Sequence, residues 1–235
     1  LHGRRVRGWV VADGVSPEAE RLVPIHKVAS AGPPPELVEL ARWAAHRWAG
    51  PVTAFLRAAS PPNAVRDPAP SELVSALHPV AAPPGGLGPW PPAPVRVVTW
   101  PPAADRRALV ASLCAAEGST LVLTPEPAAA GALVRALAAE GRDVLHHHAE
   151  LSDRVRTEVW AAARLGARVV VGGRAAVWLP IPDLAAVVVL DERDEAYQEE
   201  RAPTWQARDV AQERARRTGA LATLVSPVPS PEAVH

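Results

Sequence analysis

From residue 95 onward, short apolar segments alternate with longer amphipathic ones, and this alternation limits the possible folds more than any other feature. The apolar segments are rich in Val and Leu and are bounded by turn residues, which is typical of buried β-strands. Six strands are predicted, over residues 95–99, 120–124, 143–146, 168–172, 186–190 and 222–225. The amphipathic segments predict helices that end near Gly118, Gly141, Gly166 and Gly219, since glycine commonly follows a helix. The pattern therefore predicts an α/β fold with a parallel sheet covered by helices on both faces.

The first 67 residues predict a smaller module of mixed helix and strand. Residues 6–11 read as a strand closed by an Asp13–Gly14 turn, and residues 36–48 read as a helix with an apolar stripe. A second short helix is predicted over 52–59, after the Gly50–Pro51 break. Residues 68–94 are rich in Pro and Gly and predict a semi-stiff linker. The chain is thus expected to comprise a module over 1–67, a linker over 68–94 and an α/β lobe over 95–235.

Charge separates the front of the chain from the rest, although the whole chain has no formal net charge. Residues 1–67 carry nine Lys and Arg against six acidic residues, whereas residues 95–235 carry sixteen against eighteen. A surface that contacts phosphate groups is therefore expected in the front module, with Arg4 and Arg5 as candidates. An ordinary solvated face is an equally good interpretation of the charge alone.

The positions of cysteine and histidine argue against disulfide bonds and metal sites in this chain. Cys114 is the only cysteine, so no intramolecular disulfide is possible, and a reducing cytoplasm suits the chain. No apolar run approaches the ~20 residues that a membrane-spanning helix needs, so no membrane partner is expected. His146 and His148 share one face of a predicted strand, but only Glu150 lies near them in the sequence. No metal site is predicted there.

The strand over 186–190 leads directly into Asp191 and Glu192. An apolar strand with Asp-Glu at its tip is typical of a Walker B motif, in which the Asp holds Mg²⁺ and the Glu orients the attacking water. These two residues are the candidate catalytic pair. The alternative is an acidic loop that simply follows a buried strand.

A phosphate-binding loop is expected after the first strand, but residues 99–107 do not resemble one. The segment contains Pro101 and Pro102 and no Gly, and residues 95–235 contain no Lys. Such a loop needs glycines for close backbone approach and a Lys to reach the phosphates, whereas prolines remove backbone donors. Thr99, Arg106 and Arg107 remain as degenerate nucleotide-site candidates. The sequence therefore disfavours ordinary binding and hydrolysis of Mg-ATP.

Several motifs together resemble the primosomal protein N′ family of replication-restart helicases. They are LVLTPE (121–126), HAELSDRVRTEVW (148–160), VVGGRAAV (170–177), VVVLDERDEAYQEE (187–200), APTWQARDVA (202–211) and LVSPVPSPEA (224–233). They include Gly172, Arg174, Arg208 and Asp209 at motif positions of the family. The front is similar in a less specific way, with Gly3 at a position for a nascent-strand 3′ end and Lys27 at a DNA-contacting position.

The resemblance implies a RecA-like first helicase lobe preceded by part of a domain that binds the 3′ end of DNA. Forked or single-stranded DNA, single-strand DNA-binding protein and primosome components are the implied partners, in the cytoplasm with the nucleoid. The family uses ATP with Mg²⁺ and also zinc, but its Gly-Lys-Thr loop is replaced here and its zinc cysteines are absent from this chain. We therefore predict a DNA-fork-binding factor that has no cofactor in this chain and does not hydrolyse ATP. The alternatives are an ATP-dependent 3′-to-5′ DNA helicase and a fragment with no activity of its own.

Overall fold

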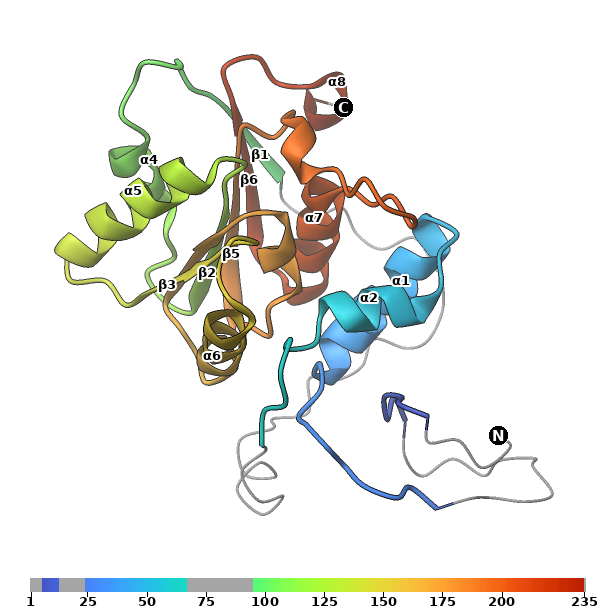
Figure 1. The fold of residues 1–235 in the computed structure, drawn as a ribbon. Helices are drawn as coiled ribbons and strands as arrows, with labels where there is room; N and C mark the ends of the chain where they lie inside the picture. The colour runs from blue at the N-terminus through green and yellow to red at the C-terminus, as the bar shows by residue number, and fades with distance from the viewer. Residues whose placement is uncertain (1–5, 13–23, 67–94, 235) are drawn as a thin grey trace.

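One six-stranded sheet organises the structure, a computed structural model that describes residues 6–12, 24–66 and 95–234 (Figure 1). The strand order is β1-β6-β5-β2-β4-β3, and every neighbouring pair is parallel. The strands are β1 (Val95–Thr99), β2 (Ser119–Leu123), β3 (Val144–His147), β4 (Val169–Gly172), β5 (Leu184–Leu190) and β6 (Leu221–Ser226). The predicted α/β class and parallel sheet are confirmed, and each strand lies within two residues of its predicted bounds.

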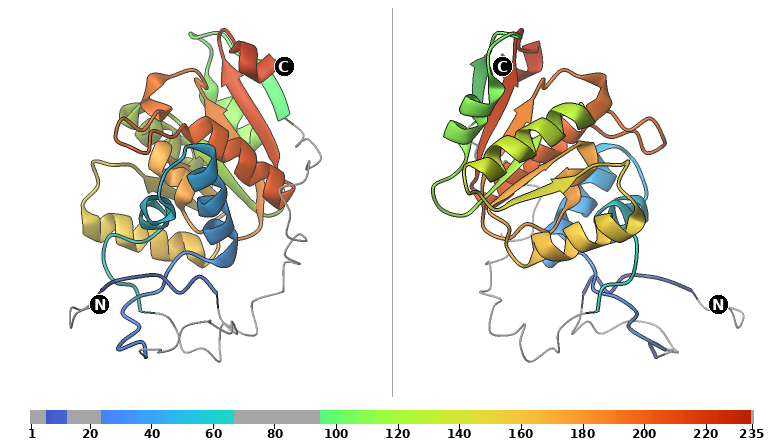
Figure 2. Two further views of the ribbon diagram at one scale, coloured as in Figure 1. Left: turned by 90° about the vertical axis from the view of Figure 1, so that its right-hand side faces the viewer. Right: turned by 60° about the vertical axis from the view of Figure 1, so that its left-hand side comes forward.

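Helices cover both faces of this sheet (Figure 2). One face packs against α4 (Arg106–Leu113) and α5 (Pro127–Ala139), and the other against α6 (Asp153–Arg164), the short helix η1 (Arg174–Trp178) and α7 (Ala207–Thr218). Side chains alternate between the two cores along each strand, so that Leu121 and Leu123 join the α6–α7 side while Val122 joins the α4–α5 side. The alternation explains why the strands are apolar throughout: both of their faces are buried.

Two helices from the front of the chain form an additional layer on the α7 side. They are α1 (Pro35–Arg47) and α2 (Val52–Ala58), and their apolar side chains belong to the same buried core as those of α6 and α7. The ring centroids of Phe55 and Trp178 are 5.8 Å apart, and the Trp160 indole donates a 2.9 Å hydrogen bond to the carbonyl of Ala59. Residues 35–59 therefore pack as part of the lobe's own core. The division of the chain at 67 and 94 stays a prediction, because residues 67–94 lie outside the described residues.

The predicted strand over residues 6–11 is wrong. Residues 6–12 form no strand, and the Val6 and Val10 side chains are 66% and 65% exposed. A strand needs a partner for its backbone hydrogen bonds, and the described residues offer none to this segment. The Trp9 indole instead donates a 2.8 Å hydrogen bond to Ser60 Oγ, so the segment is attached through a side chain. The Asp13–Gly14 turn lies outside the described residues.

No helix in the described parts of the chain is long and apolar enough to cross a membrane.

Two adjacent glycines, the last residue of β4 and the one that follows it, offer a matched test of packing at the end of this strand. A Cβ on Gly172 would lie 2.3 Å from the His147 carbonyl oxygen and 2.6 Å from the Ala176 Cβ, whereas a Cβ on Gly173 would meet nothing within 4 Å. We expect Gly172→Ala to lower the free energy of unfolding by about 1–3 kcal/mol, and Gly173→Ala to change it by less than about 0.5 kcal/mol. Urea denaturation of both variants measures this difference, and equal effects would contradict the close approach.

A buried histidine at the end of β3 makes stability depend on pH. The His147 side chain is 7% exposed and its Nδ1 has no hydrogen-bond partner among the described residues. Burial, with a smaller contribution from the nearby Arg156, lowers the pKa of His147 from 6.5 to about 4. Because the pKa is lowered in the folded state, the His147 contribution to the free energy of unfolding is fully present above pH 6.5. As the pH falls from there towards 4, the unfolded chain binds a proton that the folded chain does not.

We therefore expect His147 to account for a loss of about 2–3 kcal/mol in the free energy of unfolding between pH 7 and about pH 4.5. Urea denaturation at the two pH values measures the loss, and His147→Leu should reduce it. The control His46→Gln changes an exposed side chain on α1 and should leave the pH dependence intact. An unchanged pH dependence in His147→Leu would show that other groups cause it.

Candidate functional site

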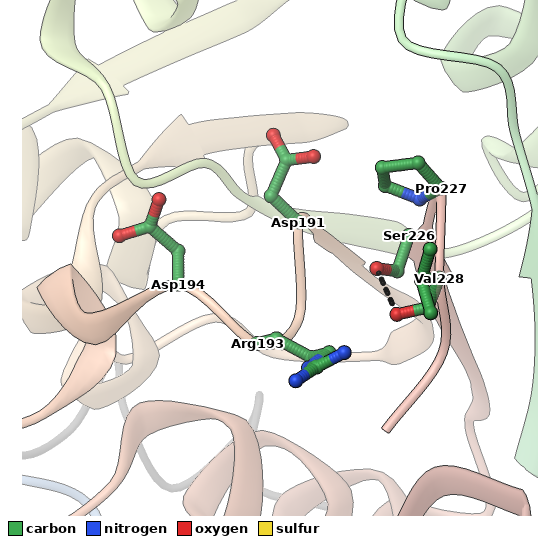
Figure 3. Close-up of a pocket in the computed structure, with 6 residues that line it drawn as sticks. All are labelled: Asp191, Arg193, Asp194, Ser226, Pro227 and Val228. Carbon is green, nitrogen blue, oxygen red and sulfur yellow. Dashed lines mark hydrogen bonds between the residues drawn. The ribbon is translucent and has the colours of Figure 1, made fainter.

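The candidate site lies at the carboxyl edge of the sheet, where β1, β5 and β6 end. Parallel strands present their carboxyl ends at one edge, which is where ligands of such sheets bind. A hollow of about 340 Å³ opens there, and Figure 3 shows the residues that line it. They are Asp191, Arg193, Asp194, Ser226, Pro227 and Val228. The Ser226 hydroxyl donates a 2.9 Å hydrogen bond to the Val228 carbonyl, which turns the loop after β6 back on itself.

Asp191 is bound by an arginine from the other side of the site. Both of its carboxylate oxygens accept hydrogen bonds from the Arg106 guanidinium, at 2.9 Å for Oδ1 and closer for Oδ2. Arg106 is the first residue of α4, so the ion pair joins the end of β5 to the start of that helix. Asp191 also has a left-handed backbone, with φ of 50°. The structure thus brings together two predicted site residues, but as partners of each other.

Glu192 is completely buried and bonded within the chain. Its carboxylate accepts hydrogen bonds from the Ser230 backbone N–H at 2.7 Å, from the Ser230 hydroxyl at 3.0 Å and from the Arg208 guanidinium at 3.0 Å. Arg208 also donates to Asp209 Oδ1 at 3.2 Å. Ser230 precedes α8 (Pro231–Val234), and Arg208 lies in the first turn of α7. Glu192 therefore connects β5, α7 and the segment after β6.

The start of α4 is occupied by a carboxylate of the chain itself. Asp105 caps the helix by accepting a 2.9 Å hydrogen bond from the Arg107 backbone N–H, and its oxygens also pair with the Arg107 guanidinium. The hydrogen bond from the Arg107 side chain lowers the pKa of Asp105. Just before it, the Ala104 N–H donates to the Pro101 carbonyl at 3.0 Å, which closes a tight turn. Thr99, a further candidate, pairs in register with Ser226 of β6.

Arg174 holds the segment that follows the acidic pair. Its guanidinium donates a 2.7 Å hydrogen bond to the Gln198 carbonyl and lies 3.4 Å from the Glu199 carboxylate. The buried Tyr197 hydroxyl, from the short helix η2 (Glu195–Tyr197), donates to the Leu190 carbonyl at 2.6 Å, and burial raises the pKa of Tyr197. Motif positions that the sequence offered as site residues therefore make structural contacts.

Sequence reasoning did not single out Ser230 or Tyr197. Ser230 had a detectable signal, because a Ser directly before a Pro is a common helix start. The contact between Tyr197 and Leu190 had no signal in the sequence, because it depends on how η2 folds back over β5.

The predicted DNA-contacting residues lie elsewhere. Lys27 is exposed and lies in an irregular segment that precedes α1. Figures 1 and 2 show this segment at the opposite end of the molecule from α8. Gly3, Arg4 and Arg5 lie outside the described residues. The structure thus does not bring Lys27 to the carboxyl edge of the sheet.

Comparison with known proteins finds sequence similarity to bacterial replication restart proteins. No family model matches the sequence. The replication restart protein PriA of Chlamydia trachomatis is 40% identical over 94 residues, which are 39% of this chain and 12% of that protein. PriA of Chlamydia pneumoniae is 38% identical over 117 residues (48% and 16%), and the probable PriA of Deinococcus radiodurans is 38% identical over 130 residues (53% and 14%).

A solved structure, the C-terminal domain of the DEAD-box protein Dbp5, is 19% identical with a TM-score of 0.44 and covers 60% of this chain and 81% of that one. The matches to the three PriA proteins span only 12–16% of the length of each. Over about half of its own length, however, this chain is homologous to replication restart proteins named PriA, which confirms the resemblance to the primosomal protein N′ family.

Proposed function

We propose that this chain is part of a replication restart protein that binds forked or single-stranded DNA and does not hydrolyse ATP. Homology to PriA proteins supports the role in replication restart. One observation carries the proposal against hydrolysis: the groups that would meet Mg²⁺ and phosphate are bound to each other. Asp191 pairs with Arg106, and the Asp105 carboxylate caps α4.

The capped helix start is unfavourable for a triphosphate. Phosphate groups bind at helix N-termini because the backbone N–H groups there are free and the helix dipole favours negative charge. In this chain a carboxylate already takes that place, so a phosphate would meet a like charge. Pro101 and Pro102 add no backbone donors, and the Ala104 N–H is bound to Pro101. Mg-ATP therefore does not fit the residues that are present.

The acidic pair is equally unsuited to hold Mg²⁺. Binding a cation at Asp191 would require the bidentate Arg106 pair to break, and such pairs are among the stronger charged hydrogen bonds. Glu192 is fully buried and faces Arg208 and Ser230, so it has no path to a water at the hollow. Neither residue is free for the role that its position in the sequence suggests.

DNA binding is proposed for the front of the chain. Lys27 and Arg7 are exposed there, and neither makes an ion pair within the described residues. Exposed basic side chains without acidic neighbours suit contacts with phosphate groups, which position DNA without reading its sequence. Single-strand DNA-binding protein and primosome components, met in the cytoplasm with the nucleoid, are proposed as partners from the family resemblance alone.

Binding to a labelled fork with a free 3′ end tests the DNA part of the proposal. We expect fluorescence anisotropy to show binding without ATP that weakens as salt rises, and Lys27→Glu to weaken it about 5- to 20-fold near physiological salt. Arg154→Glu, a charge reversal at a side chain 82% exposed on α6, is the matched control and should have little effect. Equal losses in both variants would indicate a general charge effect and remove Lys27 from the interface.

The proposed lack of ATP binding and hydrolysis is tested by two experiments on the full-length protein: a calorimetric titration with Mg-ATP and a DNA-stimulated phosphate-release assay. We expect no saturable heat and no phosphate release above background. Micromolar Mg-ATP binding with DNA-stimulated release would instead support an ATP-dependent 3′-to-5′ DNA helicase.

A further inference from the structure

Two imidazole rings lie side by side on the edge strand of the sheet. Within the described residues β3 pairs only with β4, so its other edge is unpaired. His146 and His148 project to the same face because side chains alternate along an extended chain, and their ring centroids are 4.7 Å apart. His147 between them projects to the opposite face and is buried.

One ring nitrogen of His146, the buried Nε2, has no hydrogen-bond partner among the described residues. Burial lowers the pKa of His146, and the neighbouring His148 and Arg135 lower it further. An unbonded buried polar atom is rare enough in proteins to call for a partner.

The spacing of the rings suits one metal ion between them. Imidazole nitrogens bind Zn²⁺ at about 2.0–2.1 Å, so two imidazoles on one tetrahedral ion have centroids roughly 5 Å apart. The observed 4.7 Å between centroids agrees with this value.

We propose that His146 and His148 form a two-imidazole site for a divalent transition metal ion such as Zn²⁺ or Ni²⁺. Imidazole favours this class of ion over Mg²⁺ or Ca²⁺. No group of three His, Cys, Asp or Glu side chains in the described parts of the chain could hold a metal, so water completes the coordination. The ion is therefore exchangeable and differs from the enclosed, four-ligand ions that stabilise small domains.

Glu150 supports the second imidazole. His148 Nδ1 accepts a 3.3 Å hydrogen bond from the Glu150 N–H and lies 3.9 Å from Glu150 Oε2. Binding of a metal at Nε2 of His148 moves the ring proton to Nδ1, so the hydrogen bond from the Glu150 N–H is lost, and the Glu150 carboxylate at 3.9 Å becomes the acceptor for Nδ1–H, an arrangement common around metal-bound histidine. Arg135 acts in the opposite direction, because its positive charge near His146 repels a cation. These two residues give the site opposing electrostatic contributions that can be measured separately.

Calorimetric titration of this chain with Zn²⁺, in a buffer that does not bind zinc, tests the proposal. We expect one saturable site of micromolar affinity that weakens at least about tenfold in His146→Gln and in His148→Gln. Glu150→Ala should weaken it several-fold, and Arg135→Gln should tighten it. His46→Gln, which removes an exposed histidine on α1, is the matched control and should leave it unchanged.

Circular dichroism on every variant shows whether the fold is intact, and the Zn²⁺-induced rise in melting temperature provides a second readout. That rise should disappear in the His146→Gln/His148→Gln double variant while the spectrum stays native. Zinc affinity that is equal in the double variant and the wild type, or no saturable binding to the wild type, would overturn the proposal.

Discussion

Replacing Glu192 with alanine should lower the free energy of unfolding by about 3–5 kcal/mol, because it removes the closer of the two carboxylates that pair with the partly buried Arg208 guanidinium and leaves only Asp209 at 3.2 Å. Arg208 has 14% of its side chain exposed and donates to Glu192 at 3.0 Å. The Ser230 N–H and hydroxyl would lose their acceptor in the same change. Thermal and urea denaturation measure the loss, which should also release α8 from the end of the sheet.

Two further variants separate this structural role from a catalytic one. Glu192→Gln keeps an acceptor for Ser230 but removes the charge that Arg208 faces, so it should be destabilised by less than Glu192→Ala. Glu195→Ala removes a nearby exposed carboxylate and should change stability by less than about 0.5 kcal/mol. A Glu192→Ala variant that is as stable as the wild type would contradict the structural role.

Replacing Phe55 with alanine should lower the free energy of unfolding by about 3–5 kcal/mol, as expected for a buried aromatic side chain. Phe55 is 1% exposed and contacts Trp178, whose ring in turn lies 5.6 Å from that of Trp205. Because α1 and α2 share their core with the sheet, the whole lobe should lose stability together. Hydrogen exchange should show faster opening in α1, α2, η1 and α7 at once.

The matched control for Phe55 is Val52→Ala, which shortens a partly buried side chain at the start of α2. It should cost about 1 kcal/mol and leave a single unfolding transition. Faster exchange confined to residues 35–58 in Phe55→Ala, with an unchanged sheet, would show that these helices form an independent unit.

The sheet was predictable because its strands are buried on both faces. Residues 187–190 and 169–171, for example, are apolar at every position, and short Val-rich runs bounded by turn residues are typical of central parallel strands. Residues 6–11 show why the same reasoning failed at the front. Their β-branched residues fit a strand, but strand formation depends on a partner that the local sequence does not specify.

The candidate site was predictable in position but not in its contacts. Parallel-strand order places Asp191 and Arg106 at one edge of the sheet, yet their pairing joins residues 85 positions apart. Glu192 and Ser230 are 38 positions apart, and their bond depends on the path of the loop after β6. Backbone conformation, here the left-handed Asp191, decides which of two adjacent acids faces Arg106 at the edge of the sheet and which faces the core.

The layer formed by α1 and α2 has a consequence for the continuity of the chain. These helices precede residue 67, while the lobe that they pack against begins at residue 95, and the two parts are joined by buried apolar contacts and by the Trp160–Ala59 hydrogen bond. Cleavage of the peptide backbone between residues 66 and 95 would therefore yield two fragments that stay associated. The same pieces, produced as separate polypeptides, would be expected to reassemble by complementation.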